Sequence, residues 1–166
     1  DRFGFGKRTG LDYPGESSGL VLPLDEWSGS TIGNVPIGQG IAVTPLQMVS
    51  AYATIGNSGL RRSPRLIEKI GTKRVALKRG TRVVSRHTAD RMMAMFRDVV
   101  VEGTGSEAAI PGYTVAGKTG TAQKAENGRY VRKYVASFVG LVPAKKPRFA
   151  ILVMIGLAII WYYDAD

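Results

Sequence analysis

One run of residues, Tyr113–Gln123, concentrates the groups that could bind a charged ligand; it reads Tyr-Thr-Val-Ala-Gly-Lys-Thr-Gly-Thr-Ala-Gln. Lys118 supplies a compact cation with three hydrogen-bond donors, which suits an anionic group. Thr119 and Thr121 add hydroxyl groups, and Gly120 has no Cβ, so another backbone can approach it closely. A strand edge carrying this run could bind an extended peptide that ends in a carboxylate.

The triplet Lys118-Thr119-Gly120 alone also has a simpler interpretation, a strand kinked at the glycine whose lysine is solvated. A short motif gains meaning only from its structural context. The elements around the triplet therefore decide between the two interpretations.

Two helices are expected before this run. Thr44 is a good N-cap and Pro45 suits the first helical position, so a helix is predicted from Pro45 to about Gly56. Leu46, Val49 and Ala53 recur on one face of this helix, with Tyr52 beside them. Ser85 is predicted to cap the second helix. A 3.6-residue period defines its apolar face, which comprises Ala89, Met92, Met93, Phe96, Val99 and Val100.

Three strands are expected in the C-terminal half as an antiparallel meander. The first carries Lys118, the second covers Tyr134–Leu141, and the third covers Phe149–Ile155. Asn127-Gly128 is a hairpin turn signal at the tip of a polar connection between the first two. Because the third strand is almost wholly apolar, it is predicted to be buried on both faces.

The chain is basic, with a formal charge of +10, and it contains no cysteine, which excludes disulfides, thiol catalysis and cysteine zinc sites. The charge indicates either a solvated surface or attraction to nucleic acid, an anionic membrane or an acidic wall polymer. The basic run Arg61–Arg65 lacks interleaved aromatic residues, so a solvated loop is favoured and no nucleic-acid partner is expected.

Leu66-Ile67 is a strand candidate, and Lys69–Val84 is predicted to form an irregular hairpin. His87, the one histidine, is expected to be exposed, and no metal or cofactor is expected.

Several segments together form a recognisable pattern: Gly4–Gly6, Thr9–Glu16, Gly38–Gln47, Val100–Gly105 and Ala116–Gln123. In this order they resemble the C-terminal part of the transpeptidase domain of class B penicillin-binding proteins, the peptidoglycan synthases of cell division and elongation. The resemblance covers residues 1–155 and leaves residues 156–166 as an atypical tail. It implies an α+β fold, a partial penicillin-binding-protein transpeptidase (serine β-lactamase-like) fold in which an antiparallel meander of the last three strands combines with helices.

The resemblance also implies a function. Members of the family acylate a serine with the D-Ala-D-Ala end of a peptidoglycan stem peptide and pass the acyl group to an amine on a neighbouring strand; β-lactams mimic the donor. By this resemblance Lys118 and Thr119 would bind the substrate or β-lactam carboxylate, and Gly120 would let the peptide lie close. The backbone N–H of Thr121 would form half of the oxyanion hole. The stem peptide and β-lactams are thus the expected partners.

The family's Ser-x-x-Lys and Ser-x-Asn motifs do not occur, because no serine has a lysine three residues later or an asparagine two residues later. Both motifs are expected upstream of this chain, so the chain by itself is predicted to be inactive. The missing N-terminal part of the same domain is the expected partner of the Phe149–Ile155 strand. A membrane anchor outside this chain would hold the protein at the extracytoplasmic face of the bacterial cytoplasmic membrane.

Two other functions remain open on the sequence. The chain could be a non-catalytic basic binding module on a transpeptidase scaffold, which the charge and the missing nucleophile motivate. It could also be a relative of a β-lactam sensor or β-lactamase, although Thr9–Glu16 and Gly38–Gln47 resemble the synthase branch more closely.

Overall fold

The computed structural model describes residues 2–11, 13–127 and 129–156. The chain divides into two compact units, Asp1–Met92 and Met93–Asp166. The tail predicted at 156–166 lies outside the described residues from position 157 onward, and so does Gly128 of the predicted hairpin turn.

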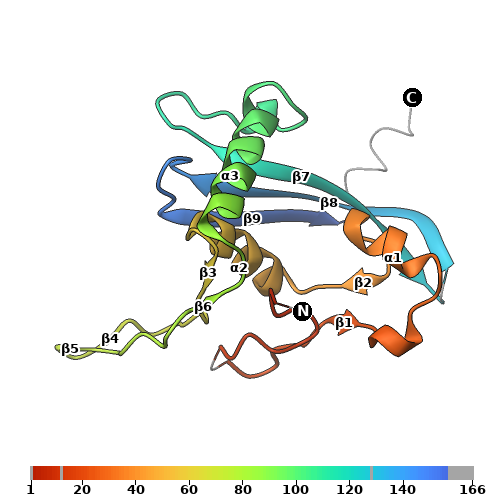
Figure 1. Cartoon of the computed structure of the whole chain (residues 1–166), viewed down its shortest axis with the longest axis horizontal. Coiled ribbons are helices and arrows are strands. Elements are labelled where there is room, and N and C mark those ends of the chain that lie inside the picture. The colour runs from red at the N-terminus through yellow and green to blue at the C-terminus, as the bar shows by residue number, and fades with distance from the viewer. Residues whose placement is uncertain (1, 12, 128, 157–166) are drawn as a thin grey trace. The chain divides into compact units, whose positions relative to one another are not determined.

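The first unit consists of short strands and helices joined by loops (Figure 1). Its elements are β1 (Leu20–Val21), α1 (Thr31–Asn34), β2 (Ile41–Ala42), α2 (Pro45–Gly56), β3 (Leu60–Arg61), β4 (Lys69–Ile70), β5 (Lys73–Arg74) and β6 (Thr81–Arg82). The strands pair antiparallel as β1 with β2, β3 with β6, and β4 with β5. Because each strand has two residues, loops and side-chain contacts must hold this unit together.

The start of α2 confirms the predicted cap. The hydroxyl of Thr44 accepts the backbone N–H of Gln47 at 3.1 Å, and the Gln47 side chain accepts the backbone N–H of Thr44 at 2.9 Å. This reciprocal capping box satisfies two donors that a helix start otherwise leaves unpaired. The helix ends at Gly56, as predicted, and Gly59 follows in the left-handed region at φ +80°.

The apolar face predicted for α2 is not its most buried side, although Leu46, Val49 and Tyr52 are half-buried. The buried residues are Gln47, Ala51, Thr54 and Ile55, whereas Ala53 is exposed. Hydrophobicity did not reveal this face because two of its four members are polar. Their hydrogen bonds are made inside the protein, which makes their burial tolerable; Thr54 donates to the Ser50 carbonyl at 2.8 Å.

The strand predicted at Leu66-Ile67 is also absent, since both residues are exposed and lie outside any strand. The chain instead pairs at β3, just before the run of basic residues, where Leu60 lies opposite Arg82. The irregular hairpin predicted over Lys69–Val84 is present as the β4–β5 pair and the returning strand β6.

Helix α3 (Arg86–Val101) follows the predicted pattern. The Ser85 hydroxyl accepts the backbone N–H of Thr88 at 3.0 Å, which is the expected N-cap bond. Its buried residues are Ala89, Phe96 and Val100, all members of the predicted apolar face. His87 is exposed in the first turn, as expected.

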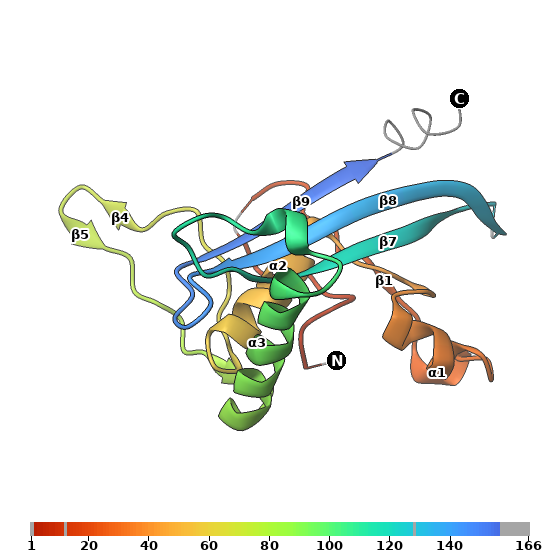
Figure 2. The same cartoon turned by 90° about the horizontal axis from the view of Figure 1, so that it is seen from above.

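The second unit contains the predicted antiparallel meander, which confirms the α+β fold class. Strands β7 (Ala116–Glu126), β8 (Arg129–Val142) and β9 (Phe149–Gly156) form one sheet in the order β7-β8-β9. Figures 1 and 2 show them side by side in one curved layer. The polar connection expected between the first two strands is itself strand, because β7 and β8 extend to a tight turn at Asn127 (φ 51°).

The prediction that the last strand is buried on both faces was wrong. Phe149, Ile151, Val153 and Ile155 alternate along β9 and are all exposed, while Leu152 on the other face is half-buried. A wholly apolar strand is buried on both faces only if another layer covers each face. Among the described residues, β9 is the edge of the sheet and pairs only with β8.

No helix in the described part of the chain is both long and apolar enough to span a membrane.

Candidate functional site

The predicted binding residues lie consecutively on β7. Within the described residues this strand pairs only with β8, so its other edge has no strand partner. The register sets Lys118 opposite Val139, Thr119 opposite Phe138, and Thr121 opposite Ala136. An edge strand directs alternate N–H and C=O groups away from its sheet, where an extended peptide can pair with them.

The start of β7 is anchored in the core. Ala116 and its cross-strand partner Leu141 are fully buried, and Val139 is nearly so. Below them the backbone N–H of Ala144 donates to the Thr114 carbonyl at 2.8 Å, which ties the loop after β8 to the approach to β7. The backbone that carries Lys118 is therefore held in place although the lysine side chain is exposed.

Within the described residues, the hydrogen bonds of the Lys118 ammonium go to its neighbour Thr119. Nζ donates to the Thr119 carbonyl at 3.0 Å and to the Thr119 hydroxyl at 3.3 Å. No ion pair joins it to a carboxylate in the part of the chain that the structure describes. Three donors and an uncompensated positive charge at the sheet edge are what a carboxylate ligand requires.

A second hydroxyl group stands beside this cation. The Thr104 and Thr119 hydroxyls are 2.8 Å apart and hydrogen-bonded. Thr104 belongs to the loop after α3, which folds back onto the helix through a 2.9 Å bond from the Gly105 N–H to the Val99 carbonyl. The sequence pattern identified Val100–Gly105 only as part of the family resemblance. It did not predict this proximity, because nothing local to either segment indicates it.

Two glycines of β7 have different surroundings. A Cβ on Gly117 would lie 2.5 Å from both the Phe138 ring and the Val139 carbonyl oxygen. A Cβ on Gly120 would meet only the Ser137 hydroxyl, at 2.7 Å. Gly117 is thus required for packing. Gly120 lies beside the Ser137 side chain, which can rotate, and because it has no side chain of its own it leaves room for a ligand to approach the backbone.

Gln47, the last residue of the motif segment Gly38–Gln47, joins the start of α2 to residues that flank two other motif segments. Its side-chain amide is buried, and it donates to the carbonyls of Lys7 at 2.8 Å and Ser18 at 2.7 Å. The loop Thr9–Glu16 is closed by the Thr9 backbone N–H, which donates to the Glu16 carboxylate at 2.7 Å, and by the Thr9 hydroxyl. The hydroxyl bond is the main cause that lowers the pKa of Glu16 below its ordinary value. These contacts make the N-terminal motifs a scaffold around the start of α2.

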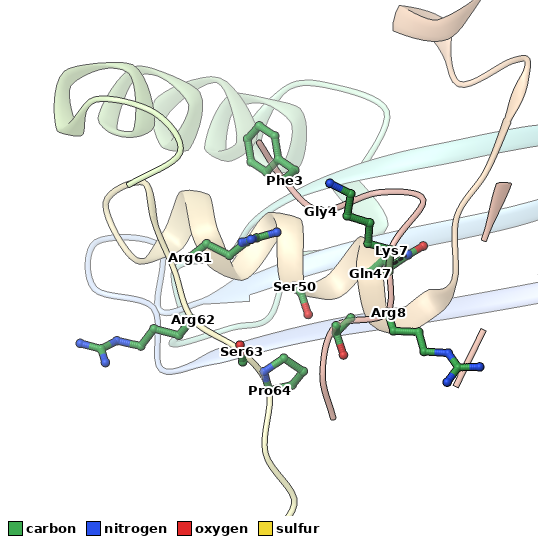
Figure 3. A pocket seen from close by; sticks show the side chains of 11 residues that line it. Phe3, Gly4, Lys7, Arg8, Gln47, Ser50, Arg61, Arg62, Ser63 and Pro64 are labelled. Carbon is green, nitrogen blue, oxygen red and sulfur yellow. Dashed lines mark hydrogen bonds between the residues drawn. The ribbon is translucent and has the colours of Figure 1, made fainter. Parts of the chain in front are cut away.

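A pocket of about 150 Å³ with a mixed polar and apolar lining lies beside this scaffold, and its lining includes Lys7, Ser50, Arg61 and Ser63. Figure 3 shows Arg8 and Arg62 extending away from it on opposite sides, while Arg61 points toward Gly4. Only part of its nominal positive charge therefore faces the interior. Among the described residues, no group of three acidic or histidine side chains could hold a metal ion.

The α+β fold and the exposed Lys118 strand are typical of a protein that binds an extended peptide, and comparison with known proteins identifies the family. Residues 1–158 match the penicillin binding protein transpeptidase domain. The chain is 44% identical to penicillin-binding protein PbpB of Mycolicibacterium smegmatis, over 92% of this chain and 26% of that protein. It is 42% identical to the peptidoglycan D,D-transpeptidase FtsI of Escherichia coli K12, over 93% of this chain and 26% of that protein.

The structural comparison agrees. The crystal structure of penicillin-binding protein 3 from Mycobacterium tuberculosis complexed with ampicillin matches with a TM-score of 0.85 at 44% identity, over 93% of this chain and 38% of that one. The chain belongs to the penicillin-binding protein transpeptidase family, and its relatives are class B members. It spans about a quarter of the length of the curated relatives it matches.

Proposed function

We propose that residues 1–155 form the C-terminal portion of the transpeptidase domain of a peptidoglycan D,D-transpeptidase, and that β7 is its substrate-binding strand. The observation that carries this proposal is the exposed Lys118 ammonium. It lies on β7, the outer strand of the sheet, and has no carboxylate partner among the described residues. The relatives named for this activity and for penicillin binding support it.

In this proposal each β7 residue has one role. Lys118 and the Thr119 hydroxyl bind the terminal carboxylate of the stem peptide, or the equivalent carboxylate of a β-lactam. Gly120 allows the peptide backbone to lie against the strand. The backbone N–H of Thr121 stabilises the oxyanion that develops on the attacked carbonyl, an effect worth about 3 kcal/mol for one such donor.

The nucleophile must come from protein outside these 166 residues, because no Ser-x-x-Lys or Ser-x-Asn is present. That serine forms an ester with the penultimate D-Ala carbonyl while the terminal D-Ala leaves, and an amine of a second strand then takes the acyl group. The chain alone is therefore inactive. The exposed apolar residues of β9, such as Phe149 and Ile151, support docking of the upstream part of the same domain against this strand.

A cell-wall substrate requires an extracytoplasmic location. We place the complete protein at the outer face of the bacterial cytoplasmic membrane, held by an anchor outside the 166 residues.

Lys118→Ala in the complete protein tests the site. We expect the rate of acylation by a fluorescent penicillin to fall about 10- to 100-fold, because a charged hydrogen bond is worth about 1.5–3 kcal/mol. Lys146→Ala removes an equally exposed lysine from the loop between β8 and β9 and should leave the rate unchanged. Equal rates in wild type and Lys118→Ala would reject the carboxylate-binding role.

The isolated chain provides a second test, since it should not become covalently labelled by the same penicillin. Labelling that survives denaturing electrophoresis would show that a nucleophile exists within these residues. It would overturn the proposal that the catalytic serine lies outside them.

A further inference from the structure

A basic arm, residues 62–79, projects from the first unit. Figures 1 and 2 both show its β4–β5 hairpin standing away from α2. Leu66, Ile67, Ile70 and Leu77 on this arm are each more than half exposed. So many aliphatic side chains left in solvent on one short segment are typical of a binding surface.

A cavity of about 350 Å³ opens between the two legs of the arm, and Gly10 of the N-terminal loop also lines it. Its apolar wall includes Leu66, Ile67, Ile70, Val75 and Leu77. This volume is within the range of sites that accept a large side chain or a small ligand. The arm is therefore a preformed concave apolar site and not merely a row of exposed residues.

Arginine side chains hold the legs at this separation. Arg65 donates through Nη1 to the Val75 carbonyl at 3.0 Å, and Arg62 reaches the Lys78 carbonyl at 3.4 Å. The Val75 backbone N–H donates to the Glu68 carbonyl at 3.0 Å. Because these partners are neutral carbonyls, and no ion pair joins Arg62 or Arg65 to a carboxylate of the described residues, their guanidinium charges remain available at the rim of the cavity.

The charge of the arm is predominantly positive, and Arg62, Arg65 and Lys78 line the cavity itself. Glu68 is the only acidic residue of the arm, and its carboxylate lies 3.9 Å from Arg74, an exposed pair. The cations of the arm are Arg62, Arg65, Lys69, Lys73, Arg74, Lys78 and Arg79. Such a rim favours an acidic partner and disfavours a second copy of this chain, which carries a net charge of +10.

We propose that the basic arm is a docking site for an acidic peptide segment of a partner protein, whose central apolar side chain enters the cavity while its carboxylates contact the arginines and lysines of the rim. The cavity favours a peptide over a membrane surface, because a fluid bilayer does not require a preformed pocket. This site is separate from the proposed acyl-transfer chemistry and does not depend on it.

The test uses the full chain and a set of fluorescent twelve-residue peptides. One peptide has glutamates flanking a central tryptophan, a second has serine in place of the tryptophan, and a third has lysines in place of the glutamates. We expect the first to bind at least about 10-fold more tightly than either control, and to weaken as salt is raised. Ile70→Ser and Leu77→Ser should each weaken it about 10-fold. Leu24→Ser, which alters an exposed leucine outside the arm, should not.

Three outcomes would overturn the proposal. Equal affinity for the tryptophan and serine peptides would show attraction by charge alone. Unchanged affinity in both Ile70→Ser and Leu77→Ser would place binding elsewhere, provided that circular dichroism shows both variants folded. Displacement of the peptide by phosphatidylglycerol vesicles, with arm-dependent sedimentation on them but not on phosphatidylcholine vesicles, would identify a lipid surface as the occupant.

Discussion

The surroundings of Gln47 and the strand β7 use similar residue types in opposite ways. At the start of α2, Gln47 turns inward, and all its polar atoms are satisfied by backbone groups of Lys7, Ser18 and Thr44. On β7, the side chains of Lys118 and Thr119 make hydrogen bonds with each other, with the Thr119 carbonyl and with the Thr104 hydroxyl, at the surface of the described part of the chain. The hydrogen bonds of Gln47 join segments that are distant in the chain. The polar groups on β7 lie at the surface, where a ligand can bind them.

This contrast separates the residues around Gln47, which stabilise the fold, from the residues on β7, which can bind a ligand. A buried polar group must be fully paired, because an unsatisfied one costs about 1–3 kcal/mol. An exposed polar group carries no such requirement, so it can be oriented by weak local bonds until a ligand replaces water. Substitutions around Gln47 should therefore alter stability, and substitutions at the β7 surface should alter binding.

The largest stability effect is expected for Gln47→Met. Methionine keeps the approximate shape but removes the donors to the Lys7 and Ser18 carbonyls, so we expect a loss of about 2–4 kcal/mol in the free energy of unfolding. Urea denaturation measures it. Gln39→Met, at a half-exposed glutamine, is the matched control and should change little. Similar urea midpoints for the two variants would contradict the stabilising role of the buried Gln47 amide.

Gly117→Ala should cost about 1–3 kcal/mol, because its Cβ would overlap the Phe138 ring and the Val139 carbonyl oxygen. Gly33→Ala in α1 has open space around the new methyl group and should be neutral or stabilising in the same thermal denaturation assay. Gly120→Ala should fold nearly as well as wild type. If Gly120→Ala proved the more damaging to folding, its role as a surface position would be wrong.

Thr104→Val removes the hydroxyl that bonds to Thr119 while keeping the side-chain shape. In the complete protein we expect penicillin acylation to slow by about 3- to 10-fold, which corresponds to about 1 kcal/mol. The melting temperature should not change, because Thr104 is exposed. Thr104→Ser should restore the rate. A rate equally low in both variants would mean that the hydroxyl is not what positions Thr119.

Glu16→Gln should give the smallest effect, and it should depend on pH. The Thr9 hydroxyl lowers the pKa of Glu16, so the ionised carboxylate stabilises the folded state above the ordinary glutamate pKa of about 4.3. That contribution is lost as the pH falls below this value toward the lowered pKa. Melting temperatures from pH 7 to pH 3 should therefore converge for the two proteins at low pH. A constant gap would contradict the assignment.

Local signals predicted several elements correctly. Thr44 and Pro45 marked the start of α2, and Ser85 with an apolar period marked α3, because capping and periodicity act over only a few residues. The β7-β8-β9 meander was predicted from alternation and turn residues. The binding roles of Lys118, Thr119, Gly120 and Thr121 stay predictions, although the structure places them together on an exposed strand.

The errors share one physical cause. The buried face of α2, the exposure of β9 and the absence of a strand at Leu66-Ile67 all depend on which distant segment covers a residue. An apolar run predicts a tendency to be buried, but it does not predict that a covering layer is present. Thr104 was missed for the same reason, since its partner Thr119 lies 15 positions away.

The starts of α2 and α3, the succession of a cation and two hydroxyls along one strand, and the family of the motifs could all be predicted from the amino-acid sequence. These properties depend on the chemistry of neighbouring residues. Three further features became visible only in the folded chain. The Gln47 amide is buried and bonds two distant carbonyls, the Thr104 hydroxyl bonds that of Thr119, and the basic arm lines an apolar cavity. Each of these depends on contacts between residues far apart in the chain, whose formation is governed by the free energy of the whole packed unit.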